Sequence, residues 1–215
     1  MDDEKNAGWM LIVGTLISFI TMAMHPNAHL MLDDFARFGP RNVFAHGIAL
    51  VAVPLTLVGY GAVARRLLPY AGAWARLGHA CLAVAQGAVS MAAVASGLIA
   101  TTMVSRIRAS TGAEQDLARA LLGYTGAINQ AFATVFVVGW SVAMIVWSVA
   151  IVRSAALPRW LGWYGLMVGG VLLAVTAIGR LRLDVHHFGL IVLAQGVWTL
   201  AVGAQLVRTR SVRQA

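Results

Sequence analysis

Six long stretches without a formal charge constrain the fold of this chain more than any other feature of its sequence. Lys, Arg, Asp and Glu are absent from residues 6–32, 42–64, 77–105, 120–152, 160–179 and 185–207. An α-helix rises about 1.5 Å per residue, so about 20 apolar residues cross the roughly 30 Å hydrocarbon core of a bilayer. Each stretch reaches that length, and each predicts one membrane-spanning helix.

The composition of the chain argues against an ordinary soluble domain. Of the 215 residues, 60% are hydrophobic and 11% are charged, whereas soluble domains carry about 25% charged residues. We therefore predict an all-α, polytopic integral membrane protein in which residues 1–215 form a single six-span domain. The expected spans are residues 9–24, 43–63, 77–103, 131–152, 160–178 and 188–207.

The connection between the third and fourth predicted spans has a pattern of its own. Thr111 and Glu114 have the spacing of a capping box, and Leu117, Leu121 and Tyr124 follow at helical intervals. This pattern is typical of an amphipathic helix that lies at the membrane surface. We therefore predict a six-transmembrane-helix bundle with an interfacial helix between spans 3 and 4.

Basic residues indicate the orientation of the chain and its partners. In a six-span topology, nine of the 16 Lys and Arg residues fall on the side of the two termini and seven on the other side. This excess predicts a multi-pass protein of the cell membrane, or inner membrane, with cytoplasmic termini. The net charge of +8 is then accounted for by topology and by attraction to acidic lipids of the bilayer. No basic run with interleaved aromatic residues indicates binding to nucleic acid.

Glycines predict where helices approach one another closely. Gly189, Gly196 and Gly203 recur every seven residues in the last span, and Gly165 and Gly169 are separated by four residues in the fifth. Small residues at such spacings let the backbone of a neighbouring helix come near. We expect these glycines to have a packing role. The sequence carries no signal for an oligomeric state.

Five of the six histidines fall at the same end of the predicted spans. His25 and His29 follow the first span, His46 opens the second, and His186 and His187 open the last. A six-span topology places all five on one membrane face, opposite the termini. We therefore expect a polar cluster at the outer mouth of the bundle.

Four of these histidines are the predicted ligands of a transition metal or haem. The expected metal ligands are His25, His46, His186 and His187, with Asp184 as a further ligand or as the acceptor that orients a ring. We assign His46 and His187 as cofactor-binding residues, because both lie near the start of a span and converge if their helices are neighbours. The nearby thioethers of Met22 and Met24 favour copper over zinc or haem.

Amide side chains within the apolar stretches give a different interpretation. Unpaired amides are costly in a membrane, so such residues bond across helices or face a cavity. The predicted cavity-lining residues are Gln86, Asn129, Gln130 and Gln195. They indicate a small-solute permease or channel with a polar cavity.

The sequence is therefore compatible with three alternative functions. The chain binds a transition metal or haem at its outer face, or passes a small solute, or is a structural or partner-binding membrane subunit without a site. Signatures of hydrolases, zinc proteases, P-loop proteins and dinucleotide-binding enzymes are absent from the sequence. Whether the chain is an enzyme is left open.

Overall fold

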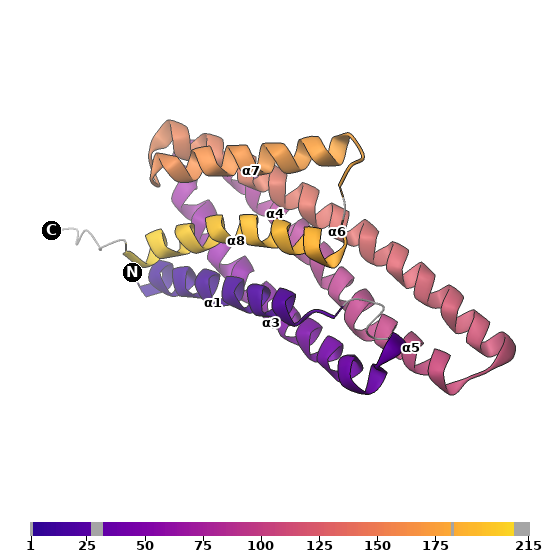
Figure 1. Cartoon of the computed structure of the whole chain (residues 1–215). Helices are drawn as coiled ribbons and strands as arrows, with labels where there is room; N and C mark the ends of the chain where they lie inside the picture. The colour runs from indigo at the N-terminus through magenta and orange to yellow at the C-terminus, as the bar shows by residue number, and fades with distance from the viewer. Residues whose placement is uncertain (1, 27–31, 182, 209–215) are drawn as a thin grey trace.

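The computed structural model of the chain describes residues 2–26, 32–181 and 183–208, and helices make up nearly all of this part (Figure 1). The helices are α1 (Asp2–Met24), α3 (Phe35–Ala71), α4 (Ala73–Ala93), α5 (Ala100–Ala109), α6 (Gly112–Ser154), α7 (Arg159–Ala177) and α8 (Val185–Arg208). A single π-helical segment, η1 (Val94–Ile99), joins α4 to α5. With α4, η1 and α5 counted as one rod, six helices are long and apolar enough to cross a membrane. The prediction of an all-α chain with six spans is confirmed to this extent.

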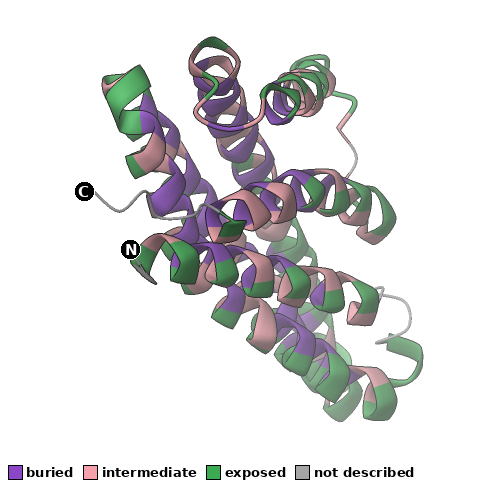
Figure 2. Cartoon of the chain, turned by 90° about the vertical axis from the view of Figure 1, so that its left-hand side faces the viewer, coloured by how far each residue is buried: buried purple, intermediate pink, exposed green. Residues whose placement is uncertain are grey.

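Apolar side chains on the outer faces of the helices agree with a membrane environment. Buried residues lie where helices face one another, and exposed residues lie on the outside of the bundle (Figure 2). On α1 the outer face carries Trp9, Val13, Leu16 and Ile20, which are 45 to 51% exposed. Contiguous apolar surface of this kind is rare on soluble monomers, whereas lipid covers it readily. The fold is therefore that of a multi-pass membrane protein.

The helices are arranged so that both ends of the described chain meet. α1 packs between α3 and α8, while α6 packs against both α4 and α7. Gly203 of α8 lies against Gly8 of α1, and Gly196 lies against Phe19, so the two helices run antiparallel. The start of α1 and the end of α8 consequently lie together at one end of the bundle, here called the terminal end (Figure 1). The opposite end, where α1 finishes and α8 begins, is called the histidine end.

The connection after α5 differs from the prediction of a separate interfacial helix. Thr111 is the residue that precedes the new helix, although its side chain makes no capping hydrogen bond. From Gly112 the chain then continues as one 43-residue helix, α6, which includes the whole fourth span. No proline interrupts residues 112–154, so nothing in the backbone ends the helix at a membrane surface. At about 1.5 Å per residue α6 is about 65 Å long, and its first half extends beyond the bundle beside α5 (Figure 1).

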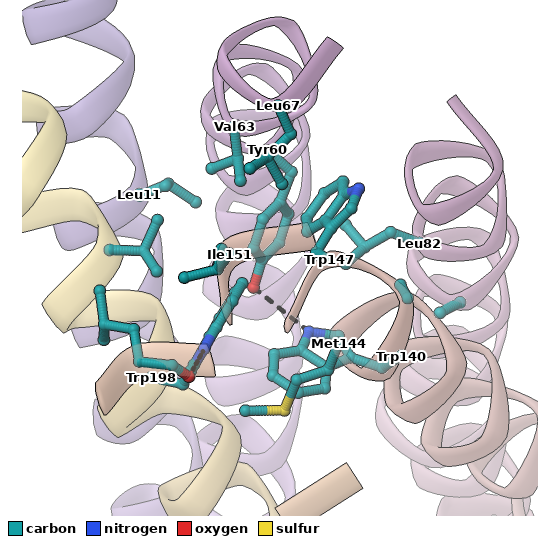
Figure 3. Close-up of a cluster of buried hydrophobic side chains, with 14 of the residues drawn as sticks. Leu11, Tyr60, Val63, Leu67, Leu82, Trp140, Met144, Trp147, Ile151 and Trp198 are labelled. Atoms are coloured by element: carbon teal, nitrogen blue, oxygen red, sulfur yellow. Dashed lines mark hydrogen bonds between the residues drawn. The ribbon is translucent and has the colours of Figure 1, made fainter. Parts of the chain in front are cut away.

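The terminal half of the bundle contains the most tightly packed core. Trp147 of α6 and Trp198 of α8 are fully buried beside Leu11, Leu67 and other apolar side chains (Figure 3). The two indoles stack with centroids 6.4 Å apart. Each indole N–H donates to a backbone carbonyl, that of Trp147 to Ala75 at 3.0 Å and that of Trp198 to Leu161 at 3.0 Å. This cluster fills the space between the helices in the terminal half of the bundle.

Candidate functional site

Two of the predicted ligands, His25 and His46, lie in contact at the histidine end. His25 follows the last residue of α1, and His46 lies on the buried face of α3, in its fourth turn. Their ring centroids are 4.6 Å apart with an interplanar angle of 67°. The Nδ1–H of His25 donates to the carbonyl of Pro26 at 2.8 Å, and that of His46 donates to the carbonyl of Asn42 at 2.8 Å. Because a carbonyl only accepts, both rings carry their proton on Nδ1, and both Nε2 atoms keep a free lone pair.

The environment of this pair limits its protonation. Burial lowers the pKa of His25, although the hydrogen bond to the Pro26 carbonyl acts in the opposite direction. The guanidinium of Arg41 lies close by, since its Nε donates to the Met24 carbonyl at 2.8 Å. The His46 ring lies against His25. Near neutral pH the structure therefore favours a neutral imidazole at His25.

The π-helical segment η1 packs directly against His46. A Cβ atom at Gly97 would overlap the His46 side chain, so only glycine allows this approach. Asn42, which is fully buried, donates its amide N–H groups to the Ser96 carbonyl at 2.9 Å and to Thr101 Oγ1 at 2.9 Å. π-helical segments recur at functional sites because they free backbone carbonyls from the helical ladder. Asn42 and η1 were not predicted from the sequence, where their signals are an amide at the first position of a charge-free stretch and a glycine inside a span.

His187 makes a second pair, with Asp184. Asp184 precedes α8 and accepts from the backbone N–H groups of His186 and His187, each at 3.1 Å, as a helix cap. Its other oxygen accepts from His187 Nδ1 at 2.6 Å. The backbone N–H of His187 is the main cause that lowers the pKa of Asp184, and the His187 ring adds to it. The aspartate therefore orients the His187 ring, and its own position is explained by capping of α8.

The predicted metal ligands thus form two pairs. Among the described residues, no three His, Cys, Asp or Glu side chains come together in a way that could hold a metal ion. α3 packs mainly against α1, which is the physical reason that His46 meets His25. α3 and α8 touch deeper in the bundle, where Tyr60 lies 2.8 Å from Thr199 Oγ1. His186 is exposed and contributes its backbone N–H to Asp184. His29 lies outside the described residues.

A cavity of about 120 Å³ lies inside the bundle, next to the histidine end. Five helices line it, namely α1, α3, α4, α6 and α8. Its outermost lining residues include Met22, Ala49 and Phe188, which are within one helical turn of His25, His46 and His187. Its innermost lining residues include Tyr60, Trp140 and Thr199, which border the tryptophan cluster of the terminal half. At this inner end the cavity meets the aromatic side chains of Tyr60 and Trp140, which belong to the buried cluster in Figure 3.

Two of the four predicted cavity-lining amides belong to this cavity. Gln86 of α4 and Gln195 of α8 are both among its lining residues, with 6% and 3% exposure. The Nε2 and Oε1 atoms of Gln195 have no hydrogen-bond partner. Asn129 and Gln130 are not among the lining residues, because they lie in the outer half of α6, where Gln130 donates to the Leu183 carbonyl at 3.3 Å. A buried amide without protein partners is costly, so Gln195 gives the cavity wall a donor and an acceptor that are able to bond a ligand.

A chain of hydrogen bonds joins three helices at the inner end of the cavity. The indole N–H of Trp140 donates to the Tyr60 hydroxyl at 3.2 Å. Thr199 Oγ1 donates to its own helix at the Gln195 carbonyl, 3.0 Å away. The Tyr60 hydroxyl, 2.8 Å from Thr199 Oγ1, is therefore the donor in that pair. These polar groups are satisfied among themselves and fix the shape of the cavity floor.

Comparisons with known proteins do not add to this geometry. No family model, no curated protein and no solved structure gives a significant match to the chain.

Proposed function

We propose that this chain is a membrane protein that binds a small solute in its intramembrane cavity and passes it as a permease or channel. The observation that carries the proposal is the cavity of about 120 Å³ with the unpaired amide of Gln195 in its wall. Ligand sites are concave, largely apolar, and equipped with a few polar groups that orient the ligand. The cavity has this character, because Val53, Val89, Val192 and other apolar residues surround its polar groups.

The size of the cavity restricts the solute. A cavity that binds a drug-sized molecule has about 300 to 1,000 Å³, which is well above the volume of about 120 Å³ found here. An apolar cavity of about 150 Å³ accommodates benzene. The solute is accordingly one of about six or fewer non-hydrogen atoms.

The position of the cavity gives a direction of access. It begins within a helical turn of the three histidines and ends at the aromatic side chains of the terminal half. The solute enters from the histidine end, which the charge bias assigns to the outer side of the cell membrane, with the termini in the cytoplasm. Release to the other side then requires the cluster around Trp140 to rearrange.

Flux measurements on the whole chain test this proposal. Purified protein is reconstituted in liposomes, and osmotic swelling is followed by light scattering with urea, glycerol or methylammonium chloride as the probe. We expect at least one probe to enter faster than in empty liposomes, and Gln195→Leu to abolish the difference. Asn129→Leu is the matched control, since it removes an amide outside the cavity, and it should leave the flux unchanged. Equal swelling of empty and protein-containing liposomes for all three probes would overturn the proposal.

A second candidate, binding of a transition metal at His25 and His46, rests on the protonation of the two rings. Ligating histidines commonly donate their other ring N–H to a backbone carbonyl or carboxylate, and both histidines make this bond. Two neutral imidazoles with free Nε2 atoms suit Cu(I), which accepts a low coordination number, better than a catalytic zinc ion, which needs three protein ligands.

Metal analysis separates this candidate from solute passage. Protein prepared with copper, zinc and haem in the medium should contain copper close to one per chain, and His46→Ala should lose it. A preparation with neither stoichiometric metal nor a Soret band rules this candidate out and leaves the solute cavity standing. A partner that co-purifies in fixed ratio, together with no flux and no metal, would instead favour a structural subunit.

A further inference from the structure

The hydroxyl groups around the cavity all donate their protons away from it. Thr15 and Ser18 of α1 donate to the Leu11 and Gly14 carbonyls at 2.7 and 3.0 Å. Ser90 of α4 donates to the Gln86 carbonyl at 2.8 Å. The other threonine hydroxyls in the cavity wall also donate to backbone carbonyls: Thr21 to Ala45, Thr56 to Ala52, and Thr199 to Gln195. Toward the cavity these side chains therefore present oxygen lone pairs.

The remaining polar groups of the cavity wall leave an excess of hydrogen-bond acceptors over donors. The Tyr60 hydroxyl donates to Thr199 Oγ1, and the Trp140 indole N–H donates to the Tyr60 hydroxyl. The amide groups of Gln86 and Gln195 are the side-chain donors left in the wall, and each amide also brings an acceptor oxygen. Acceptors in the cavity consequently outnumber donors, and within residues 2–26, 32–181 and 183–208 no Lys, Arg or His lines it.

Aromatic rings supply a second kind of attraction. Phe136, Trp140 and Phe188 line the cavity together with Tyr60. The faces of such rings attract cations, and the attraction grows where water is excluded. Apolar residues of α3 and α8 surround the rest of the space and suit a short hydrocarbon chain.

We infer that the solute of this cavity is a small primary amine, held through its N–H groups by the hydroxyl oxygens and the amide oxygen of Gln195. The inference rests on the proposed function and names the substrate class of the same site. An ammonium group offers three donors and no acceptor, which complements a wall of acceptors. The alkyl part contacts the apolar residues, and the aromatic faces stabilise the charge when the amine is protonated. A carboxylate of the same size would find only two amide groups to donate to it.

Binding of a matched set of solutes tests the inference on the full chain in lipid nanodiscs. Propylammonium chloride, tetramethylammonium chloride and sodium propionate are each titrated into the protein at pH 7, and the heat of binding is followed by calorimetry. We expect propylammonium to bind, and tetramethylammonium, which has the charge but no N–H group, to bind at least about tenfold more weakly, since loss of charged hydrogen bonds costs more than 1.4 kcal/mol. Propionate should give no heat above the salt control.

Three variants connect this binding to the cavity wall. Thr15→Val and Ser90→Ala each remove an acceptor from the cavity with little change of shape, and combined they should weaken propylammonium binding about tenfold or more. Thr176→Val is the matched control, because Thr176 in α7 makes the same bond to its own helix, to the Leu172 carbonyl at 2.7 Å, but does not line the cavity. It should leave the affinity unchanged.

A repeat at pH 9 to 11 shows which form of the amine binds. The affinity for total amine falls with deprotonation only if the ammonium ion is the ligand.

The outcomes separate the inference from the function on which it rests. Propionate binding as tightly as propylammonium, with sensitivity to Gln195→Leu, would overturn the amine inference and leave a solute cavity. Propylammonium binding that is equal in the Thr15→Val, Ser90→Ala double variant and in wild type would overturn it as well. No heat from any of these solutes, together with no flux of urea, glycerol or methylammonium, would overturn both.

Discussion

The terminal half and the histidine half of the bundle solve the problem of helix packing in different ways. In the terminal half, glycines let backbones meet, and a Cβ atom at Gly203 would lie 3.0 Å from the Gly8 carbonyl oxygen. Fully buried indoles fill the space between α6 and α8, and their N–H groups are satisfied. In the histidine half, the same helices enclose a cavity, and the Gln195 amide has no partner. Buried polar atoms without a partner occur in both halves, for example Ser148 Oγ in the terminal half. The difference is that the terminal half is filled by side chains, while the histidine half keeps a cavity beside its unpaired amide.

This difference locates the function more firmly than any single residue does. Proteins hold unsatisfied polar groups and irregular helix where a ligand or a change of shape needs them. Here the unpaired amide, the π-helical segment η1 and the His25–His46 contact all belong to the histidine half. Substitutions in the terminal half should therefore lower the stability of the fold. Substitutions in the cavity wall of the histidine half should impair passage of the solute without lowering stability.

The largest effect is expected from Trp198→Ala in the terminal half. Trp198 is 1% exposed and packs on Trp140 and Trp147. Truncation of a buried aromatic residue to alanine costs about 3 to 5 kcal/mol. We expect a large fall of the thermal unfolding midpoint in detergent, measured by circular dichroism. A midpoint within a degree or two of wild type would show that this half is not the stabilising core.

Gly203→Leu should be the next most damaging change. Its side chain would meet the Gly8 carbonyl oxygen and Leu11 of α1, and a backbone oxygen cannot move aside. Overpacking of this kind costs about 1 to 3 kcal/mol. Gly87→Leu is the matched control, because a Cβ atom at Gly87 meets nothing within 4 Å. Equal unfolding temperatures for the two variants would show that the close approach of α8 to α1 at Gly203 does not contribute to stability.

The sequence predicted the packing of helices better than it predicted the cavity. Gly189, Gly196 and Gly203 were expected to face a neighbouring helix, and all three lie against α1. Six charge-free stretches were enough to predict six spans, since length and hydropathy alone decide whether a helix can cross a bilayer. The amphipathic pattern after Thr111 was misleading, because surface amphipathicity does not end a helix that has no breaker.

The candidate site depended on helix neighbours, which periodicity does not give. His25 and His46 meet because α1 and α3 are consecutive and pack together. The expected approach of His187 to His46 required α3 and α8 to pack together at the histidine end, whereas α3 packs mainly against α1 and touches α8 deeper in the bundle, at Tyr60 and Thr199. Thr15, Tyr60 and Thr199 were missed for another reason. Single hydroxyls in an apolar helix usually bond their own backbone, so only the three-dimensional arrangement shows that several of them share one cavity.

A smaller effect of opposite sign is expected from Gln195→Leu in the histidine half. The substitution removes a buried amide whose two polar atoms have no partner, at nearly constant volume. Relief of that penalty should stabilise the chain by about 1 to 2 kcal/mol, while solute flux is lost. The pair of measurements is a thermal midpoint and a liposome assay on the same preparation. A destabilised variant with normal flux would reverse the assignment of roles to the two halves.

The smallest effect is expected from the pH dependence contributed by His25. Burial lowers the pKa of His25 from its ordinary value of 6.5, so the unfolded chain binds a proton at a higher pH than the folded one. The folded state is therefore unaffected by this group above pH 6.5, and it loses stability as the pH falls from 6.5 toward the lowered pKa. The His46 ring contacts His25, and Arg41 donates to the carbonyl of the neighbouring Met24. His25→Asn should reduce the fall of the unfolding midpoint between pH 7 and pH 5, and should have its smallest effect at pH 8, where the imidazole is neutral in both states. An unchanged slope would mean that the histidine half tolerates a charge at its mouth, and that its polar contacts are looser than those of the terminal half.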